Sequence, residues 1–425
     1  NYGKPIMKNL IKYLLISMII CFTYPNKLLI PMDLSQTDHL KAYGLIFWNL
    51  ENNRNVDWLL NYRGGSFMMD ANSTTQSECL IRGIKFELIN ANQLAGILAT
   101  INDNNMDIVL LETVPKIAVY SPPGKQPWDD AVTLALTYAE VKYDVIFDEE
   151  VLSGLLKDYD WLHLHHEDFT GQYGKFYKNY RNRAWYKKME LEFQKTALNF
   201  GFNSVHELKK NIASEIKKYV SKGGFLFAMC SATDSYDIAL ATLNTDIASE
   251  VFDGSPIDPD YQSKLDFNNT FAFENFELYT DPMIYEYSTI DVPPGHKPVA
   301  KGAEEDYFTL FEFSAKWDPV PTMLTQNHVG VINGFMGQTT AFNRNIIKDH
   351  VVILGEVEGE DIVKYIHSNI GKGSFTFLGG HDPEDYRHMV GDPPTDLSLH
   401  RNSPGYRLIL NNILFPSARK KDRKT

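Results

Sequence analysis

The stretch GGFLFAMCSATDS, residues 223–235, decides the predicted fold. Two glycines precede the apolar run 225–229, and small polar residues follow Cys230. A short apolar run bounded by glycines predicts a buried strand, and small residues after it permit a sharp turn into a helix. Such a turn would project the Cys230 thiol from the end of a sheet, which is the geometry of a nucleophile elbow. The alternative is that Cys230 is a small buried side chain that ends a core strand.

On both sides of this stretch, strand-like apolar runs alternate with amphipathic helical runs, a rhythm that predicts parallel strands covered by helices. We therefore predict an N-terminal α/β unit over residues 26–115 and a second domain over residues 116–425. The second domain is predicted to be α/β, a flavodoxin-like doubly wound parallel sheet, whose sites lie beyond the carboxyl ends of the strands. Between about residues 240 and 345, short strands and many turns predict a β-rich insertion.

Residues 1–25 are typical of a secretory signal peptide, with residues 1–6 as an upstream extension. Lys8 and Lys12 lead into the apolar run 13–22, and Pro25 follows it. A basic start before a short apolar run is the layout of a leader, and the run is too short to span a bilayer. We expect export to the periplasm or cell envelope, with membrane contact only through this leader.

Charge and cysteine content exclude several classes of protein. The formal net charge is −13, whereas a nucleic-acid-binding face needs concentrated Lys and Arg. Beyond the leader the chain has two cysteines, Cys79 and Cys230, and no Cys/His spacing typical of zinc sites. Two cysteines are too few for a disulfide framework and leave open either one disulfide or a free Cys230. We expect no cofactor and no nucleic-acid partner.

His381 is the predicted partner of Cys230, because it also follows a predicted strand, at residues 374–378. A thiol nucleophile needs a base, and a helix N-terminus behind the cysteine would favour the thiolate. A neighbouring carboxylate, Glu384 or Asp382, would orient the imidazole. The predicted catalytic set is therefore Cys230, His381, Glu384 and Asp382, with backbone N–H groups near Ser231 holding the oxyanion.

The run HLHHED, residues 163–168, is a second candidate site. On a strand, His163 and His165 would share one face, as two imidazoles that bind a metal do. We favour a pocket lining without metal, and the alternatives are a metal site at His163 and His165 or simple packing. Arg63 lies in a Gly-Gly turn that could cradle an anion. The residues predicted to contact substrate or the oxyanion are therefore Arg63, His165, His166, Glu167 and Ser231.

The Cys230 turn and the later HDPE, residues 381–384, resemble the class I glutamine amidotransferase-like superfamily. In that superfamily a cysteine on an elbow and a later His-Pro-Glu form a catalytic triad. This chain has one inserted residue in the second motif and alanines at both elbow glycines. The GKG at residues 371–373 is similar to the trehalose-utilisation-type branch of the superfamily. The resemblance covers roughly residues 116–240 and 350–415.

Longer stretches resemble a family of exported bacterial proteins commonly named asparagine synthetase B family proteins: KLLIPMDLSQTDHLKAYG (27–44), DWLHLHHEDFTGQYGKFY (160–177) and GGHDPEDY (379–386). We do not expect ATP-dependent asparagine synthesis, because the Ser-Gly-Gly-x-Asp-Ser loop and the N-terminal cysteine of those enzymes do not occur here. The resemblances imply a Cys-His-Glu amide hydrolase acting on a small polar amide. The alternatives are a non-catalytic envelope module that binds a glycan or a cell-envelope protein, and a metal-dependent hydrolase.

Overall fold

The computed structural model describes residues 26–124, 126, 128–291, 303–318 and 321–418, which form two compact units. Among these residues, the first unit comprises 26–114, 313–328 and 417–418, and the second comprises 115–312 and 329–416. The predicted leader, residues 1–25, lies outside the described residues. No helix within the described ranges has the length and apolar character that crossing a membrane requires.

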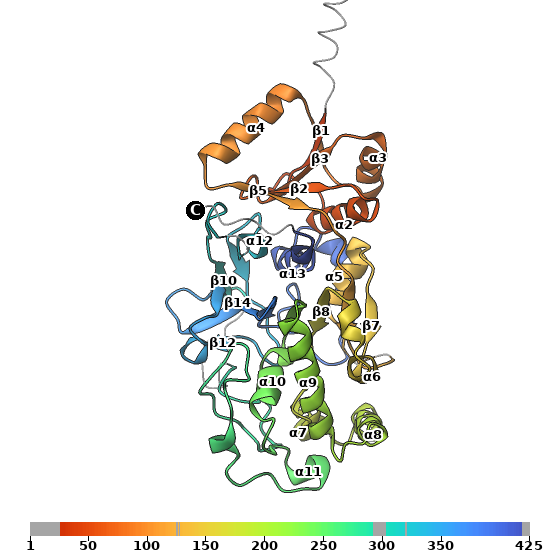
Figure 1. The fold of residues 1–425 in the computed structure, drawn as a ribbon, viewed down its shortest axis with the longest axis vertical. Coiled ribbons are helices and arrows are strands. Elements are labelled where there is room, and N and C mark those ends of the chain that lie inside the picture. The colour runs from red at the N-terminus through yellow and green to blue at the C-terminus, as the bar shows by residue number, and fades with distance from the viewer. Residues whose placement is uncertain (1–25, 125, 127, 292–302, 319–320, 419–425) are drawn as a thin grey trace, which may run out of the picture. The chain divides into compact units, whose positions relative to one another are not determined.

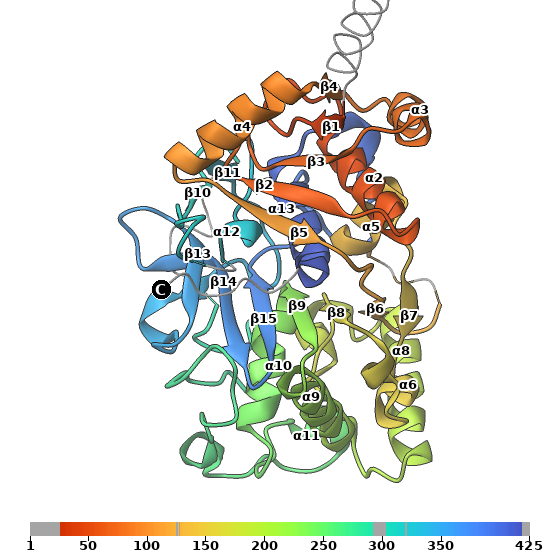
Figure 2. The ribbon, with the colours of Figure 1, turned by 45° about the horizontal axis from the view of Figure 1, so that its top comes forward.

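The first unit is built on a five-stranded sheet with the strand order β4-β1-β3-β2-β5. Figure 1 labels β1, β2, β3 and β5 of this sheet, and Figure 2 labels all five strands. Its strands are β1 (Lys27–Ile30), β2 (Val56–Leu60), β3 (Ser66–Asp70), β4 (Glu87–Ile89) and β5 (Asp107–Leu111). Its helices are α2 (His39–Glu51), α3 (Ser73–Arg82), α4 (Ala91–Asp103) and the short α12 (Pro321–Leu324). Each pair of neighbouring strands in this sheet is antiparallel.

Helices cover both faces of this sheet because successive strand residues point in opposite directions. Trp58 packs edge-on against Tyr43 of α2, with 6.5 Å between the ring centroids. Leu59 and Met68 point to the opposite face, where they form a buried cluster with Ile97 of α4. The unit therefore has three layers, helix, sheet and helix.

The prediction of a parallel N-terminal unit is wrong. The sequence analysis missed β3, which lies between β1 and β2 and is antiparallel to both. Gly64 and Gly65, with φ of +75° and +84°, reverse the chain between β2 and β3. Two strands joined by so short a turn form an antiparallel hairpin, whereas parallel pairing needs a long crossover.

The second unit contains a ten-stranded mixed sheet with the order β11-β10-β13-β14-β15-β9-β8-β6-β7, and β12 pairs with β14. The parallel half comprises β6 (Ile117–Tyr120), β7 (Asp144–Ile146), β8 (Trp161–Leu164), β9 (Phe225–Met229) and β15 (Gly373–Leu378). The antiparallel half comprises β10 (Tyr307–Leu310), β11 (Val331–Asn333), β12 (Phe342–Asn343), β13 (Val352–Glu356) and β14 (Ile362–Ile370). Figure 2 shows β14, β15, β9 and β8 following one another across the sheet.

The helices of the second unit include three long ones, α8 (Ala184–Asn199), α9 (Val205–Ser221) and α10 (Ser231–Ala241). Two more, α5 (Ala131–Ala139) and α13 (Pro404–Leu414), pack against each other. Short helices are α6 (Asp148–Leu152), α7 (Tyr177–Tyr180) and α11 (Glu250–Asp253). Side chains of β8, β9, β15, α9 and α10 form the main hydrophobic core.

The prediction of a flavodoxin-like doubly wound parallel sheet is also wrong, because the first sheet is antiparallel and half of the second is too. Gly359 and Gly371, both with positive φ, lie in the turns that join β13 to β14 and β14 to β15 as hairpins. The predicted β-rich insertion, about residues 240–345, supplies β10, β11 and β12 to this sheet, and residues 313–328 belong to the first unit.

Parallel pairing of β6, β8, β9 and β15 places their carboxyl ends at one edge of the second sheet. His165 and His166 follow β8, Cys230 follows β9, and His381 lies just beyond β15. Candidate catalytic residues from three separate stretches of the chain therefore lie at the same edge of the sheet.

Asp237 of α10 provides a test of how this unit is held together. Its buried carboxylate accepts hydrogen bonds from the backbone N–H groups of Phe271 (2.7 Å), Ala272 (2.7 Å) and Phe273 (3.0 Å). Each buried N–H left without an acceptor costs about 1–3 kcal/mol. We expect Asp237→Ala to lower the free energy of unfolding by about 3 kcal/mol or more, and Asp237→Asn to lower it less, in urea denaturation. Equal stability of Asp237→Ala and wild type would contradict this account.

Candidate functional site

Cys230 lies at the junction between β9 and α10 in a backbone conformation that is rare for a residue with a side chain. Its φ and ψ are +52° and −139°, and only 2% of the residue is exposed. A strained conformation of this kind costs about 1–3 kcal/mol and persists only where the surrounding structure enforces it. It turns the chain sharply at the end of the strand, as the sequence predicted, and presents the sulfur to a cavity.

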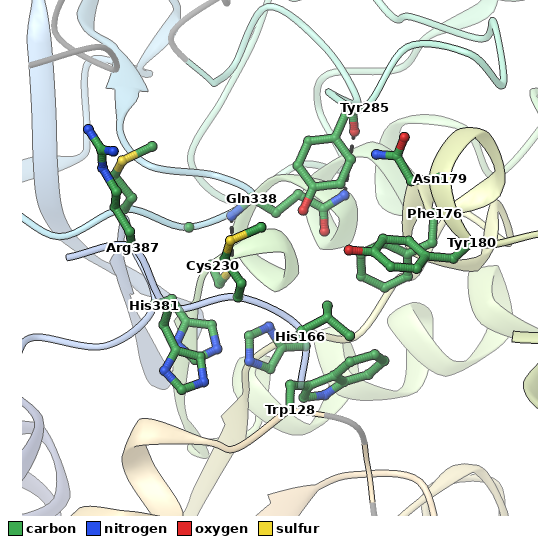
Figure 3. Close-up of a pocket in the computed structure, with 15 residues that line it drawn as sticks. Trp128, His166, Phe176, Asn179, Tyr180, Cys230, Tyr285, Gln338, His381 and Arg387 are labelled. Carbon is green, nitrogen blue, oxygen red and sulfur yellow. Dashed lines mark hydrogen bonds between the residues drawn. The ribbon is translucent and has the colours of Figure 1, made fainter. Parts of the chain in front are cut away.

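The cavity has a volume of about 480 Å³. Four aromatic side chains form much of its wall: Trp128, Phe176, Tyr180 and Tyr285. Cys230, His166 and His381 also line it, and Figure 3 shows these three side chains facing the same space. A cavity of this size with an apolar wall and a few convergent polar groups is typical of a small-molecule site.

The segment 336–340 connects the two ends of the site. The Gln338 N–H donates a hydrogen bond to the Cys230 sulfur at 3.2 Å, and the His381 N–H donates to the Met336 carbonyl oxygen at 2.9 Å. Gly337 fits between them, since a Cβ there would lie 3.1 Å from both the Cys230 sulfur and the Gly380 backbone. This segment therefore holds the thiol and His381 at the same cavity.

The Cys230 thiol is protonated at neutral pH. Burial raises its pKa to about 11, although the backbone N–H groups of Gln338, Thr339 and Ser231 act to lower it. The sequence predicted that the N-terminus of α10 would favour the Cys230 thiolate. That prediction is wrong, because burial keeps the thiol protonated in the resting protein. A base must remove the proton before the sulfur can attack.

His381 is a neutral imidazole in the same wall. Burial lowers its pKa well below the usual range, and the nearby rings of His166, His165 and His388 lower it further. The centroids of these rings lie 4.2 Å, 4.7 Å and 4.8 Å from that of His381. A neutral ring has a lone pair that can accept a proton. No hydrogen bond joins it to the Cys230 thiol among the described residues, so a substrate or water would have to complete the contact.

Glu384 and Asp382 do not orient His381 in this structure. The Glu384 carboxylate pairs with His400, with 3.0 Å between Oε2 and Nδ1. Asp382 accepts hydrogen bonds from the backbone N–H groups of Glu384 and Asp385 and from the Thr395 hydroxyl. The His388 ring stacks on His381 instead, with 4.8 Å between the ring centroids.

Of the other residues predicted to contact substrate, His166 lines the cavity, whereas Glu167 and Arg63 do not. His166 lines the cavity, and its Nε2 lies 3.1 Å from the Asp129 carbonyl oxygen. Glu167 is buried, does not line the cavity, and has its pKa raised by burial to about 8. Arg63 belongs to the first unit, where it pairs with Asp33 at 2.6 Å and with Glu87 at 3.0 Å.

His163 lies on β8 and His165 follows its end, and both side chains face Asp130. His163 Nε2 lies 3.2 Å from Asp130 Oδ2, and His165 Nδ1 lies 3.4 Å from Asp130 Oδ1. Burial acts to raise the Asp130 pKa, but the two histidines hold it well below its usual range. Asp130 Oδ1 also caps α5 by accepting from the N–H groups of Val132 and Thr133.

Several residues in or beside the site were not predicted from the sequence: Trp128, Asp129, Asp130, Tyr285 and Gln338. The adjacent carboxylates Asp129 and Asp130, ahead of a predicted helix, were a usable signal, because ligands gather at such strand-to-helix connections. No sequence pattern marks Gln338 or Tyr285, which come from long irregular segments.

No family model and no curated protein matches the sequence. Among solved structures, the chain is similar to two cytoplasmic proteins of Salmonella typhimurium, with 12% and 11% identity and TM-scores of 0.34 and 0.33. Each of these matches covers 72% of this chain and 100% of the other. It is also similar to a β-galactosidase from Bacillus circulans sp. alkalophilus, with 12% identity, a TM-score of 0.25, and coverage of 63% of this chain and 29% of that one. Similarities of this degree support no conclusion about fold or function.

The reactivity of Cys230 tests the burial of its thiol. Because only the thiolate reacts with iodoacetamide, we expect slow alkylation at pH 7 and a rate that rises about tenfold per pH unit up to at least pH 9. Mass mapping of peptides after timed quenching measures this, with Cys79 as an internal control. Burial raises the Cys79 pKa to about 12, and Cys79 does not line the cavity, so it should react more slowly.

A Cys230 rate that is already maximal at pH 7 would mean that the thiolate is stable at rest. A Cys230 rate no higher than that of Cys79 would mean that the sulfur does not face an accessible cavity.

Proposed function

We propose that the protein is a cysteine-dependent hydrolase of a small polar amide, with Cys230 as nucleophile and His381 as base. The observation that supports this most strongly is that a thiol on a strained elbow and a neutral imidazole line one cavity. The two residues come from the ends of β9 and β15, which are parallel neighbours in the sheet. A nucleophile and a base that rest on adjacent strands are held in fixed relation by the sheet.

In the proposed reaction, His381 accepts the thiol proton as the Cys230 sulfur attacks the carbonyl carbon of the amide. The tetrahedral intermediate collapses, the C–N bond breaks, and His381 returns the proton to the leaving amine. Water then attacks the thioester with His381 again as base, which releases the carboxylic acid and restores the thiol. The backbone N–H groups of Ser231, Gln338 and Thr339, which already approach the sulfur, are placed to polarise the carbonyl oxygen.

Both groups rest in the protonation state from which the reaction starts, but the lowered pKa makes the imidazole a weak base toward so weakly acidic a thiol. A thiol whose pKa is raised to about 11 needs a base, and an imidazole whose pKa is lowered stays unprotonated at neutral pH. In place of a carboxylate, the rings of His166 and His388 contact His381 and fix its plane. A cavity of about 480 Å³ admits a small molecule, and its aromatic wall would pack on the carbon skeleton of the substrate.

The sequence supports two further proposals, one about where the protein is located and one about the family to which it belongs. The leader-like residues 1–25 support export to the periplasm or cell envelope. The stretches that resemble asparagine synthetase B family proteins support membership of that exported group, without ATP-dependent synthesis.

Release of ammonia from a panel of small carboxamides, glutamine and asparagine among them, tests the function. We expect Cys230→Ala to abolish hydrolysis and His381→Gln to lower kcat about 10²–10⁴-fold, the contribution usual for a general base. Cys79→Ala is the matched control, because Cys79 is a buried thiol outside the cavity, and it should retain activity. Undiminished hydrolysis by Cys230→Ala would overturn the proposal, whereas saturable carboxamide binding without turnover would favour a non-catalytic binding module.

A further inference from the structure

The His388 ring lies between two carboxylates, those of Asp129 and Asp385. Its Nδ1 lies 3.2 Å from Asp385 Oδ2, and its Nε2 lies 2.6 Å from Asp129 Oδ1. A neutral imidazole has one N–H, so if Nδ1 donates to Asp385, the Nε2 lone pair faces a carboxylate oxygen. Nε2 has no hydrogen-bond partner in the described chain, and the His388 side chain is 1% exposed. Two acceptors this close need a proton on one of them or a cation that binds both.

Three residues near this contact, Asp129, His381 and His388, each carry a buried atom that makes no hydrogen bond in the described chain. Asp129 Oδ2 and His381 Nδ1 are buried without a hydrogen-bond partner among the described residues, and Asp129 Oδ1 and His388 Nε2 lie 2.6 Å apart without forming a hydrogen bond. One ligand atom from each of the three residues lies within 4.8 Å of the others. A buried polar atom left unsatisfied costs about 1–3 kcal/mol, so a native cluster of them usually holds water or an ion.

We propose that Asp129, His381 and His388 bind a divalent first-row transition-metal ion, such as Zn²⁺. Two imidazoles and one carboxylate form a ligand set typical of metal sites that keep an open position for water or substrate. His381 and His388 line the cavity, which gives the ion a path to solvent. Asp385 on the far nitrogen of His388 matches the carboxylate that usually orients a metal-bound histidine.

The other histidine cluster, at Asp130, is less suited to an ion. Asp130 Oδ1 is already occupied as the cap of α5, and His163 Nδ1 bonds the Phe227 carbonyl oxygen. Neither residue lines the cavity. His165, in contrast, has no hydrogen-bond partner on either ring nitrogen in the described chain, and its ring lies 4.7 Å from that of His381.

Metal binding has a consequence for the thiol chemistry, and this consequence rests on the proposed function. If Nδ1 of His381 binds the ion, the proton of the ring lies on Nε2, and the ring can no longer accept a proton from Cys230. The metal-loaded protein should then hydrolyse amides more slowly than the metal-free protein. The binding of the ion itself does not depend on any hydrolase activity.

Titration of the chelator-treated full chain with Co²⁺ tests the site, because protein-bound Co²⁺ absorbs visible light. We expect one Co²⁺ per chain, displaced by Zn²⁺, and an affinity at least about tenfold weaker in Asp129→Asn and His388→Asn, as the loss of a metal-site residue usually causes. Two controls should bind as wild type does: Cys230→Ala, since the thiol belongs to none of the ligand groups, and His400→Asn, a histidine paired with Glu384 instead.

Absence of saturable Co²⁺ binding by the wild type, or equal binding by the Asp129 and His388 variants, would overturn the metal site. A protonated His388 between Asp129 and Asp385 would then account for the contacts. Should either variant fail to fold, Zn²⁺ must still raise the melting temperature of wild type and Cys230→Ala, and no rise would contradict the site. Because Cys230→Ala binds metal without hydrolysing amides, failure of the metal site and failure of the proposed function are separately visible.

Discussion

The site depends on one set of backbone contacts, those by which the segment 336–340 ties the end of β9 to the end of β15. The Gln338 N–H bonds the Cys230 sulfur at 3.2 Å, and the Thr339 carbonyl oxygen accepts from the Gly380 N–H at 2.8 Å. Gly337 admits this approach because it has no side chain, and Gly380, with φ of +103°, turns the chain beside it. The segment adds to the parallel pairing of β9 and β15, which already brings the ends of the two strands together.

Several energetically unfavourable features lie together at the edge of the sheet where β8, β9 and β15 end. The positive φ of Cys230 is strained, and several imidazole nitrogens and carboxylate oxygens near it have no hydrogen-bond partner among the described residues. The packed core beneath, formed by β8, β9, β15, α9 and α10, supplies the rigidity that keeps such a site in place. Strain and unsatisfied polar atoms that cluster in one cavity are typical of a functional site, where ligands complete the contacts.

The sequence predicted the parts of the site that depend on local pattern. The apolar runs before Cys230 and His381 indicated two strands, and the structure has these strands as parallel neighbours. The sequence could not predict β3 or the antiparallel half of the second sheet. Apolar periodicity marks a strand, but it does not say whether the strand pairs with its neighbour through a hairpin or through a crossover. The sequence also could not predict that Glu384 pairs with His400, because the spacing of a motif does not specify which distant side chain a carboxylate contacts.

The most direct test of the central claim, that Cys230 and His381 act together at one cavity, is mass spectrometry of the protein after brief reaction with a small activated ester at neutral pH. The account predicts a single acyl group on Cys230, formed rapidly in wild type and much more slowly in His381→Gln. No acyl group on Cys230, or one that forms equally fast without His381, would contradict it.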